Sequence, residues 1–126
     1  ILIHDHFQGG RDHFPMDDAK VRCQLTSPVP GVSAALLDWP MSTIQLSGTD
    51  EQTLIAEASR ILDAWRGYSD AQCGIFAETD GTPHNTITPI LRKEGEQYRL
   101  NLAKSTRWAS SILMRRCSTS RRRSSG

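Results

Sequence analysis

The chain contains 126 residues, which is enough for one compact domain. Hydrophobic residues make up 37% of it, and no apolar run reaches the roughly 18 to 20 residues that a membrane-spanning helix requires. Because a charged-then-apolar leader is also absent, we expect a cytoplasmic protein that does not enter a membrane. The first residue is Ile rather than Met, so we expect a fragment of a longer protein.

The formal net charge of +1 hides a strong asymmetry. Residues 104–126 contain seven of the fifteen Lys and Arg residues and no acid, which leaves eight bases and fourteen acids in residues 1–103. A basic Ser/Arg-rich tail of this kind is typical of a solvated, disordered segment or of one that binds phosphate backbones. A nucleic-acid-binding module is therefore one hypothesis, and it rests on the tail alone.

The predicted elements indicate an α+β fold. Short stretches with alternating or β-branched residues, bounded by Pro, Gly and Asp, predict strands at 20–26, 33–38, 43–47, 72–78, 85–91 and 97–102. After the third strand, apolar residues recur at helical spacing from Leu54 to Trp65, and Gly67 ends the run. Thr49 and Gln52 can form a capping box at the start of this helix. We expect an antiparallel sheet with one long amphipathic helix packed on it.

The opening stretch HDHFQGG, residues 4–10, combines groups that can handle phosphate. If it is a strand, the side chains of His4, His6 and Gln8 project from one face. Imidazole can attack phosphorus, an amide can hold a phosphoryl oxygen, and Gly9 with Gly10 allows close approach of the backbone. The spacing alone leaves three interpretations open: a nucleophile, a pair of metal ligands, or structural histidines.

A second polar string, DGTPHNTITPI, spans residues 80–90. Asp80 and Gly81 predict a tight turn, after which His84 and Asn85 enter a strand. These two side chains either bind a ligand or only form hydrogen bonds within a hairpin. Arg11 has the same two interpretations, because a guanidinium that could pair with phosphate is also an ordinary solvated surface group.

Several segments together resemble one enzyme family. The run ILIHDHFQGG followed by RDHFPM, and then DWPMSTIQLS (38–47), ILDAWRGYSD (61–70) and FAETDGTPHNTITPILRK (76–93), are similar in content and order to the second class of galactose-1-phosphate uridylyltransferases. The resemblance covers residues 1 to about 102. The chain departs from the family pattern at Ile3, where Ser or Ala is usual, and at His13, which lies one place later than expected.

The resemblance implies a fold, a reaction and a site. It implies an incomplete histidine-triad-like domain over residues 1–103 that transfers UMP from UDP-glucose to galactose 1-phosphate through a uridylyl-histidine. His6 is then the nucleophile, His4 supports it and Gln8 holds the transferred group, while the substrate-binding residues are Gly9, Gly10, Arg11, His84 and Asn85. No metal ligand is assigned, and a structural metal and a homo-oligomer stay open. The alternative within the superfamily is a nucleotide phosphorylase or hydrolase.

The tail, residues 104–126, follows neither the family nor a helix or strand pattern. We expect it to be coding DNA read in the wrong frame, and hence disordered. The Trp108 codon TGG followed by GC of Ala109 forces glycine in the shifted frame, and the other codons permit HPLGILHPDAEVLHIKKK, which resembles the family at this point. If this is correct, the basic charge carries no information about nucleic acid.

Overall fold

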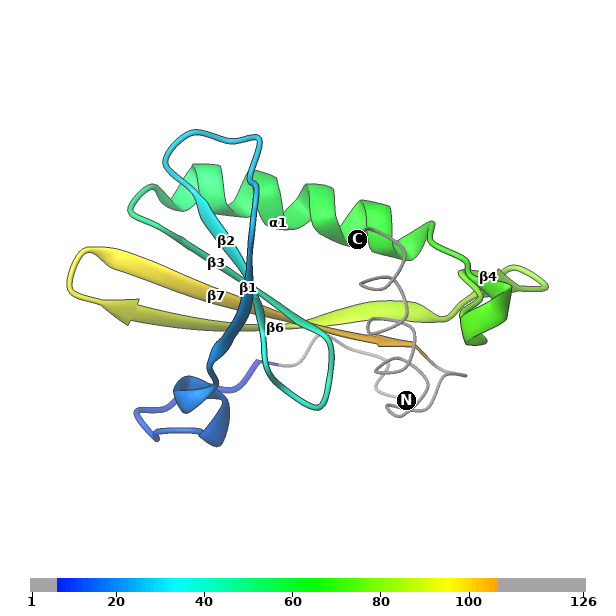
Figure 1. Ribbon diagram of the computed structural model, residues 1–126, viewed down its shortest axis with the longest axis horizontal. Coiled ribbons are helices and arrows are strands. Elements are labelled where there is room, and N and C mark those ends of the chain that lie inside the picture. The colour runs from blue at the N-terminus through cyan, green and yellow to red at the C-terminus, as the bar shows by residue number, and fades with distance from the viewer. Residues whose placement is uncertain (1–6, 107–126) are drawn as a thin grey trace.

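The computed structural model describes residues 7–106, which form a curved antiparallel sheet with a helix along one side (Figure 1). His4 and His6 lie outside the described residues, as do residues 107–126 of the tail. The elements are, in chain order, η1 (Pro15–Asp18), β1 (Val21–Leu25), β2 (Ser33–Leu37), β3 (Thr43–Gly48), α1 (Glu51–Arg66), η2 (Ala71–Cys73), β4 (Glu78–Thr79), β5 (Thr82–Pro83), β6 (Asn85–Glu94) and β7 (Gln97–Thr106).

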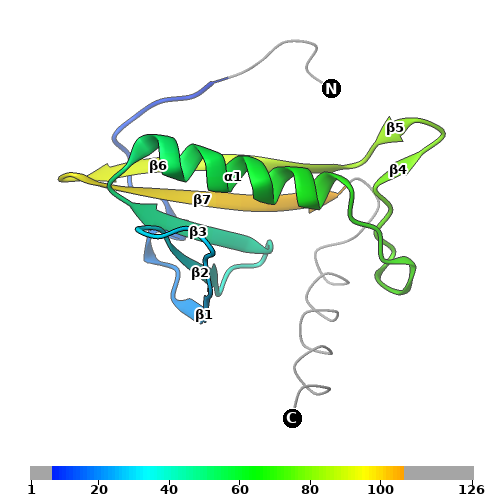
Figure 2. The same ribbon diagram turned by 90° about the horizontal axis from the view of Figure 1, so that it is seen from above.

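The main sheet has the strand order β1-β2-β3-β7-β6, and every neighbouring pair is antiparallel. β6 and β7 form a long hairpin whose turn contains Gly95 at φ 61°, a backbone conformation that glycine adopts without steric cost. β4 and β5 form a separate small hairpin that extends past the C-terminal end of α1 (Figure 2). Asn85, which begins β6, therefore lies where the small hairpin joins the main sheet.

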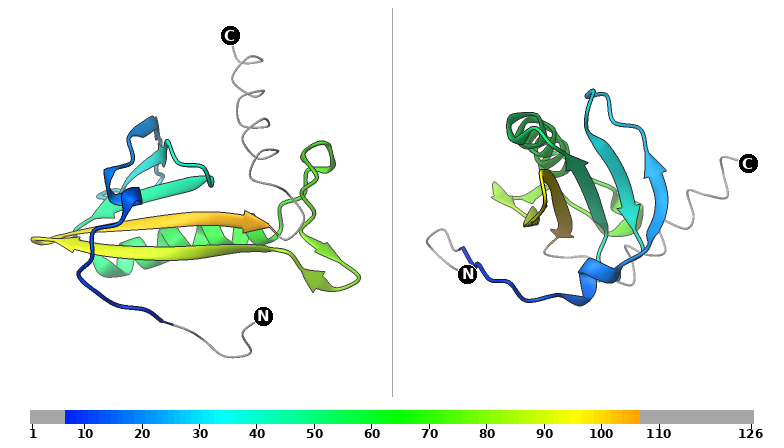
Figure 3. Two further views of the ribbon diagram at one scale, coloured as in Figure 1. Left: turned by 90° about the horizontal axis from the view of Figure 1, so that it is seen from below. Right: turned by 90° about the vertical axis from the view of Figure 1, so that its left-hand side faces the viewer.

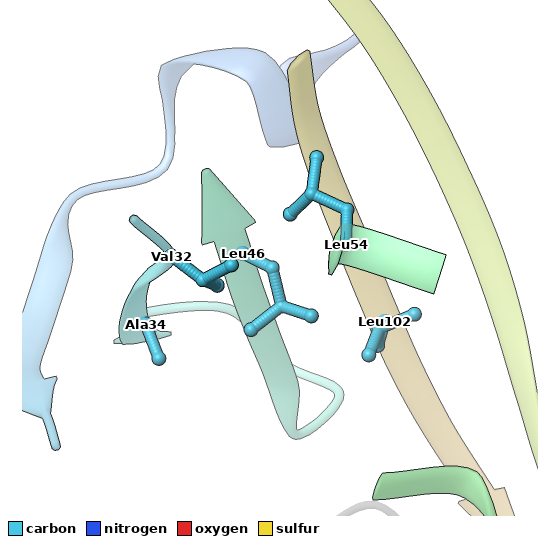
Figure 4. Close-up of a cluster of buried hydrophobic side chains, with 5 residues drawn as sticks. All are labelled: Val32, Ala34, Leu46, Leu54 and Leu102. Carbon is cyan, nitrogen blue, oxygen red and sulfur yellow. The ribbon is translucent and has the colours of Figure 1, made fainter. Parts of the chain in front are cut away.

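The helix α1 covers β3, β7 and β6 because its apolar stripe faces them. Leu54 from α1 meets a cluster of buried side chains from three strands and the turn before β2 (Figure 4); its buried members are Val32, Ala34, Leu46, Leu54 and Leu102. Leu46 is fully buried. Burial of this apolar surface, at about 25 cal/mol per Å², is what holds the helix on the sheet.

The close approach of the turn before β2 to the end of β3 requires glycine. A Cβ atom placed on Gly48 would lie 2.9 Å from the carbonyl oxygen of Gly31, closer than such atoms approach in practice. The packing of Val32 into the core thus depends on the absence of a side chain at residue 48.

The expected antiparallel sheet with one long helix is confirmed in the part of the chain that is described. The predicted capping box of Thr49 and Gln52 is wrong, because the N-cap residue is Asp50, whose carboxylate accepts a hydrogen bond from the Thr53 hydroxyl.

The strand predicted at 72–78 is also wrong, for a reason that lies in local hydrogen bonding. Asp70 and Ile75 exchange two backbone hydrogen bonds, 2.7 and 3.0 Å long, which close the chain around η2 instead of extending it. Gly74 makes this turn with φ 69°. The apolar residues Cys73 and Ile75 are buried against Trp65 by this turn and not by a strand. The last strand is longer than predicted and reaches Thr106.

Candidate functional site

The residues that follow the histidine motif lie in an exposed, irregular segment. Gln8, Gly9, Gly10 and Arg11 are all exposed, and residues 7–14 contain no strand. The described part of the opening stretch, residues 7–10, therefore does not form the strand that would project His4, His6 and Gln8 from one face. A Cβ atom on Gly9 or Gly10 would meet nothing within 4 Å, and neither residue has a positive φ. The fold of the described chain therefore does not itself require glycine at these two places.

The segment is attached to the sheet immediately after Arg11. Arg92 of β6 donates hydrogen bonds to the carbonyl oxygen of Asp12 at 2.8 Å and to the Asp17 carboxylate at 3.2 and 3.4 Å. Its guanidinium also lies 4.6 Å from the centre of the Phe14 ring, a cation–π contact. Sequence reasoning did not identify Arg92, because its partners lie about 75 residues earlier in the chain.

Two further hydrogen bonds shape this attachment. The Asp17 carboxylate accepts a hydrogen bond from the backbone amide of Phe14 at 2.8 Å, and this bond, with the nearby Arg92, holds the pKa of Asp17 below its usual range. His13 contacts Asp18 at 2.9 Å and Asp17 at 3.8 Å. The hydrogen bond to Asp18 and the charges of the two acids raise the pKa of His13.

His84 and Asn85 are buried in the structure. The His84 Nε2 atom lies 2.8 Å from the Thr79 hydroxyl of the small hairpin. The Asn85 amide nitrogen donates hydrogen bonds of 2.8 Å to the carbonyl oxygens of Trp65 and Tyr68, so it caps the C-terminal end of α1. The Asn85 Oδ1 atom is buried and has no hydrogen-bond partner within the described residues. The structure therefore gives the Asn85 amide group a structural role.

His84 and Asn85 lie far along β6 from the point where Arg92 attaches the segment that follows the histidine motif. Asn85 is the first residue of this strand and Arg92 is seven residues later. At about 3.3 Å per residue, the two ends are roughly 23 Å apart. The structure thus places His84 and Asn85 at one end of β6 and the attachment point of the motif segment near the other.

A cavity of about 610 Å³ opens beside the C-terminal half of α1, where the helix leaves β1 and β2 uncovered. Trp65 and Tyr68 line it as a stacked pair with ring centres 5.8 Å apart. The ammonium group of Lys104 lies 5.5 Å from the centre of the Trp65 ring, and burial lowers the pKa of this lysine. Trp65 also joins β6 to β7, because its Nε1 donates to the carbonyl oxygens of Thr86 and Ser105.

Two kinds of feature are not found within residues 7–106. No group of three or more His, Cys, Asp and Glu residues in this range could hold a metal ion. No helix in this range is long and apolar enough to cross a membrane. The histidine pair of the opening stretch lies outside this range, so the metal interpretation of that pair is not tested.

Comparison with known proteins gives a consistent answer. The chain is 46% identical over 103 residues to the galactose-1-phosphate uridylyltransferase of Streptococcus thermophilus, 50% identical over 107 residues to that of Butyrivibrio fibrisolvens, and 43% identical over 103 residues to that of Fusobacterium nucleatum. These alignments cover 81%, 84% and 81% of the chain, but only 21%, 28% and 20% of the relatives. No family model matches the chain, and no solved structure does.

The matched relatives define a class, the nucleotidyltransferases of galactose metabolism. More narrowly, the chain is homologous to a segment of the galactose-1-phosphate uridylyltransferases. This confirms the resemblance recognised in the sequence. The chain spans 20 to 28% of the length of these relatives.

Proposed function

We propose that this segment carries the nucleophile of a uridylyltransferase that moves UMP from UDP-glucose to galactose 1-phosphate. In the first step an imidazole nitrogen of His6 attacks the α-phosphorus of UDP-glucose, the bond from phosphorus to the bridging oxygen breaks, and glucose 1-phosphate leaves. In the second step a phosphate oxygen of galactose 1-phosphate attacks the same phosphorus and the P–N bond breaks. UDP-galactose forms and the imidazole is restored.

The other motif residues have distinct parts in this proposal. His4 supports His6 by fixing its protonation, and Gln8 donates a hydrogen bond from its amide to a phosphoryl oxygen. Gly9 and Gly10 admit the phosphate close to their backbone amides, and Arg11 pairs with its charge. The exposure of residues 8–11, and the empty space around both glycines, support this assignment.

The observation that carries the proposal is the high identity to named uridylyltransferases across four-fifths of the chain, together with the HDHFQGG motif. The identity to these relatives also favours a uridylyltransferase over a nucleotide phosphorylase or hydrolase of the same superfamily. The five-stranded antiparallel sheet with its helix supports a histidine-triad-like fold as part of the proposal. The proposal includes a cytoplasmic location for the protein and leaves the number of subunits open.

The proposal is tested in a complete enzyme, because the chain covers a fifth of its relatives. Its matching segment replaces that of the Streptococcus thermophilus relative, and exchange of labelled glucose 1-phosphate with UDP-glucose is measured. The His6→Ala variant should lose exchange, whereas His6→Gly should regain part of it when imidazole is added. Unchanged exchange in His6→Ala would refute the role of His6.

The tail has a separate proposal, namely that residues 104–126 result from a shift of reading frame. The alignments cover 81 to 84% of the 126 residues, which leaves about 20 to 24 residues unmatched, close to the 23 residues of this tail. Sequencing the locus tests this directly. An intact frame, with a stop codon or no HPLG-like segment in the shifted translation, would show that the tail is genuine.

A further inference from the structure

One residue of the sheet fixes the chain just downstream of the predicted phosphate-binding residues. Arg92 contacts three different parts of residues 12–17: the carbonyl oxygen of Asp12, the ring of Phe14 and the carboxylate of Asp17. We name these four residues the Arg92 anchor. The side chains of Arg92 and Asp17 are only 21% and 11% exposed, so water screens their ion pair less than an ordinary surface pair.

The anchor lies on the side of the sheet away from α1. Figure 2 shows the helix in front of the strands, whereas the view from below in Figure 3 shows the segment before β1 in front of them. The helix and its apolar core therefore do not hold this segment. Within the described residues 7–20, the hydrogen bonds to the rest of the chain are those of Arg92 and a backbone bond between Lys20 and Asp38.

The anchor residues of the N-terminal segment are also linked to one another. The Asp17 Oδ2 atom accepts hydrogen bonds from both the Phe14 backbone amide and Arg92, and the Arg92 Nε also donates to Oδ1. The turn η1 begins at Pro15, between Phe14 and Asp17. Proline fixes the φ angle at the first position of this turn. The Phe14 backbone, the Asp17 carboxylate and the guanidinium are therefore joined in one hydrogen-bonded network, with the Phe14 ring against the guanidinium.

We propose that Arg92 and Asp17 are positioning residues for the predicted phosphate-binding segment, residues 8–11. Asp12 is held by its carbonyl oxygen, and Gln8 precedes it by four residues, which limits Gln8 to about 14 Å from that point even in a fully extended chain. Without the anchor, the segment would be tied to the sheet first at Lys20 and would sample a far larger volume. This inference rests on the proposed function for its catalytic consequence, but the attachment itself can be measured without it.

The first experiment measures the attachment in this chain. Trypsin cleaves after Arg11, next to the fixed Asp12, so the cleavage rate there reports how often the anchor opens. Arg92→Ala should raise this rate by about tenfold or more, and Asp17→Asn, which keeps the size of the side chain, should raise it as well. The matched control is Arg99→Ala, since Arg99 is the cross-strand neighbour of Arg92 and bonds to Glu94. Equal rates in Arg92→Ala and Arg99→Ala would overturn the proposal.

The second experiment uses the complete chimeric enzyme described above. Arg92→Ala and Asp17→Asn should lower kcat by about tenfold or more with little change in KM, because misplacement weakens the transition state more than binding. Arg99→Ala should retain the parental kcat. If His6→Ala abolishes exchange while Arg92→Ala matches Arg99→Ala, the anchor has no positioning role. If His6→Ala retains exchange, or the chimera has none, the proposed function fails and the trypsin experiment alone decides whether the anchor exists.

Discussion

The capping of α1 by Asn85 leads to a quantitative prediction. Asn85, which is 3% exposed, donates two hydrogen bonds of 2.8 Å from its side chain, one to the carbonyl oxygen of Trp65 in the last turn of the helix and one to that of Tyr68 just after it. Asn85→Ala removes both and leaves the carbonyl of Trp65 without this partner. At about 1 kcal/mol for each bond, plus desolvation of the acceptors, the free energy of unfolding should fall by about 2 to 3 kcal/mol. For a domain of about 100 residues this lowers Tm by roughly 10 to 20 °C.

Urea unfolding followed by tryptophan fluorescence measures this change, because Trp65 is buried beside Asn85. Asn85→Asp should destabilise at least as much, since it places a carboxylate oxygen against the two carbonyl oxygens. The control is Thr86→Ala, whose side chain is on the exposed next residue. If Asn85→Ala unfolds at the same urea concentration as Thr86→Ala, the capping argument is wrong and the prediction of a ligand-binding Asn85 gains support.

Two further predictions concern the chain by itself. On the proposed function, the isolated 126-residue chain should show no uridylyl transfer, because a segment that spans about a fifth of its relatives cannot preorganise the transition state; measurable transfer from UDP-glucose by the purified chain contradicts this. The lowered pKa of Asp17 should stabilise the folded chain above the pKa of the unfolded state and lose this effect as the pH falls through the folded pKa. Urea unfolding over a pH series should therefore show that the free energy of unfolding falls less toward acid pH in Asp17→Asn than in the parent.

The strands and the helix were predictable from the sequence because their patterns reflect which face is buried. Alternation in TIQLSG and the apolar stripe from Leu54 to Trp65 follow directly from packing on one core. The turn at Asp70 to Ile75 was not predictable, because its apolar residues are buried by two local backbone hydrogen bonds that leave no periodic signal. The N-cap is Asp50 and not Thr49. The sequence did not distinguish them, since both residue types suit that position.

The candidate site also has one part that the sequence indicated and one part that only the structure showed. The spacing of the motif left a nucleophile, a metal pair and structural histidines open, and only the resemblance to the family favoured the nucleophile. The Arg92 anchor joins residues about 75 positions apart and required the folded chain. His84 and Asn85 were predicted to bind substrate, and this stays a prediction. Both residues are buried, and Asn85 binds two carbonyl oxygens. A polar residue at the start of a strand can therefore stabilise the fold, and need not bind a ligand.

Lys104 leads to the last prediction, because it breaks the pattern of its own strand. Tyr98, Leu100 and Leu102 alternate along β7 and pack against the core cluster, and Lys104 comes next in this series. It lines the cavity beside Trp65, and no acid pairs with it among the described residues.

Burial lowers the pKa of Lys104, so its charged form destabilises the folded state. Lys104→Leu should therefore raise the free energy of unfolding by about 1 kcal/mol at pH 7. In the parent, stability should increase as the pH rises from the folded pKa toward 10.5, and the leucine variant should lack this part of the increase. If Lys104→Leu is no more stable than the parent, the buried lysine does not destabilise the fold and the prediction is wrong. The predicted gain, by contrast, is what a residue outside the selected reading frame would produce, because an unselected side chain has no reason to match the apolar row it continues.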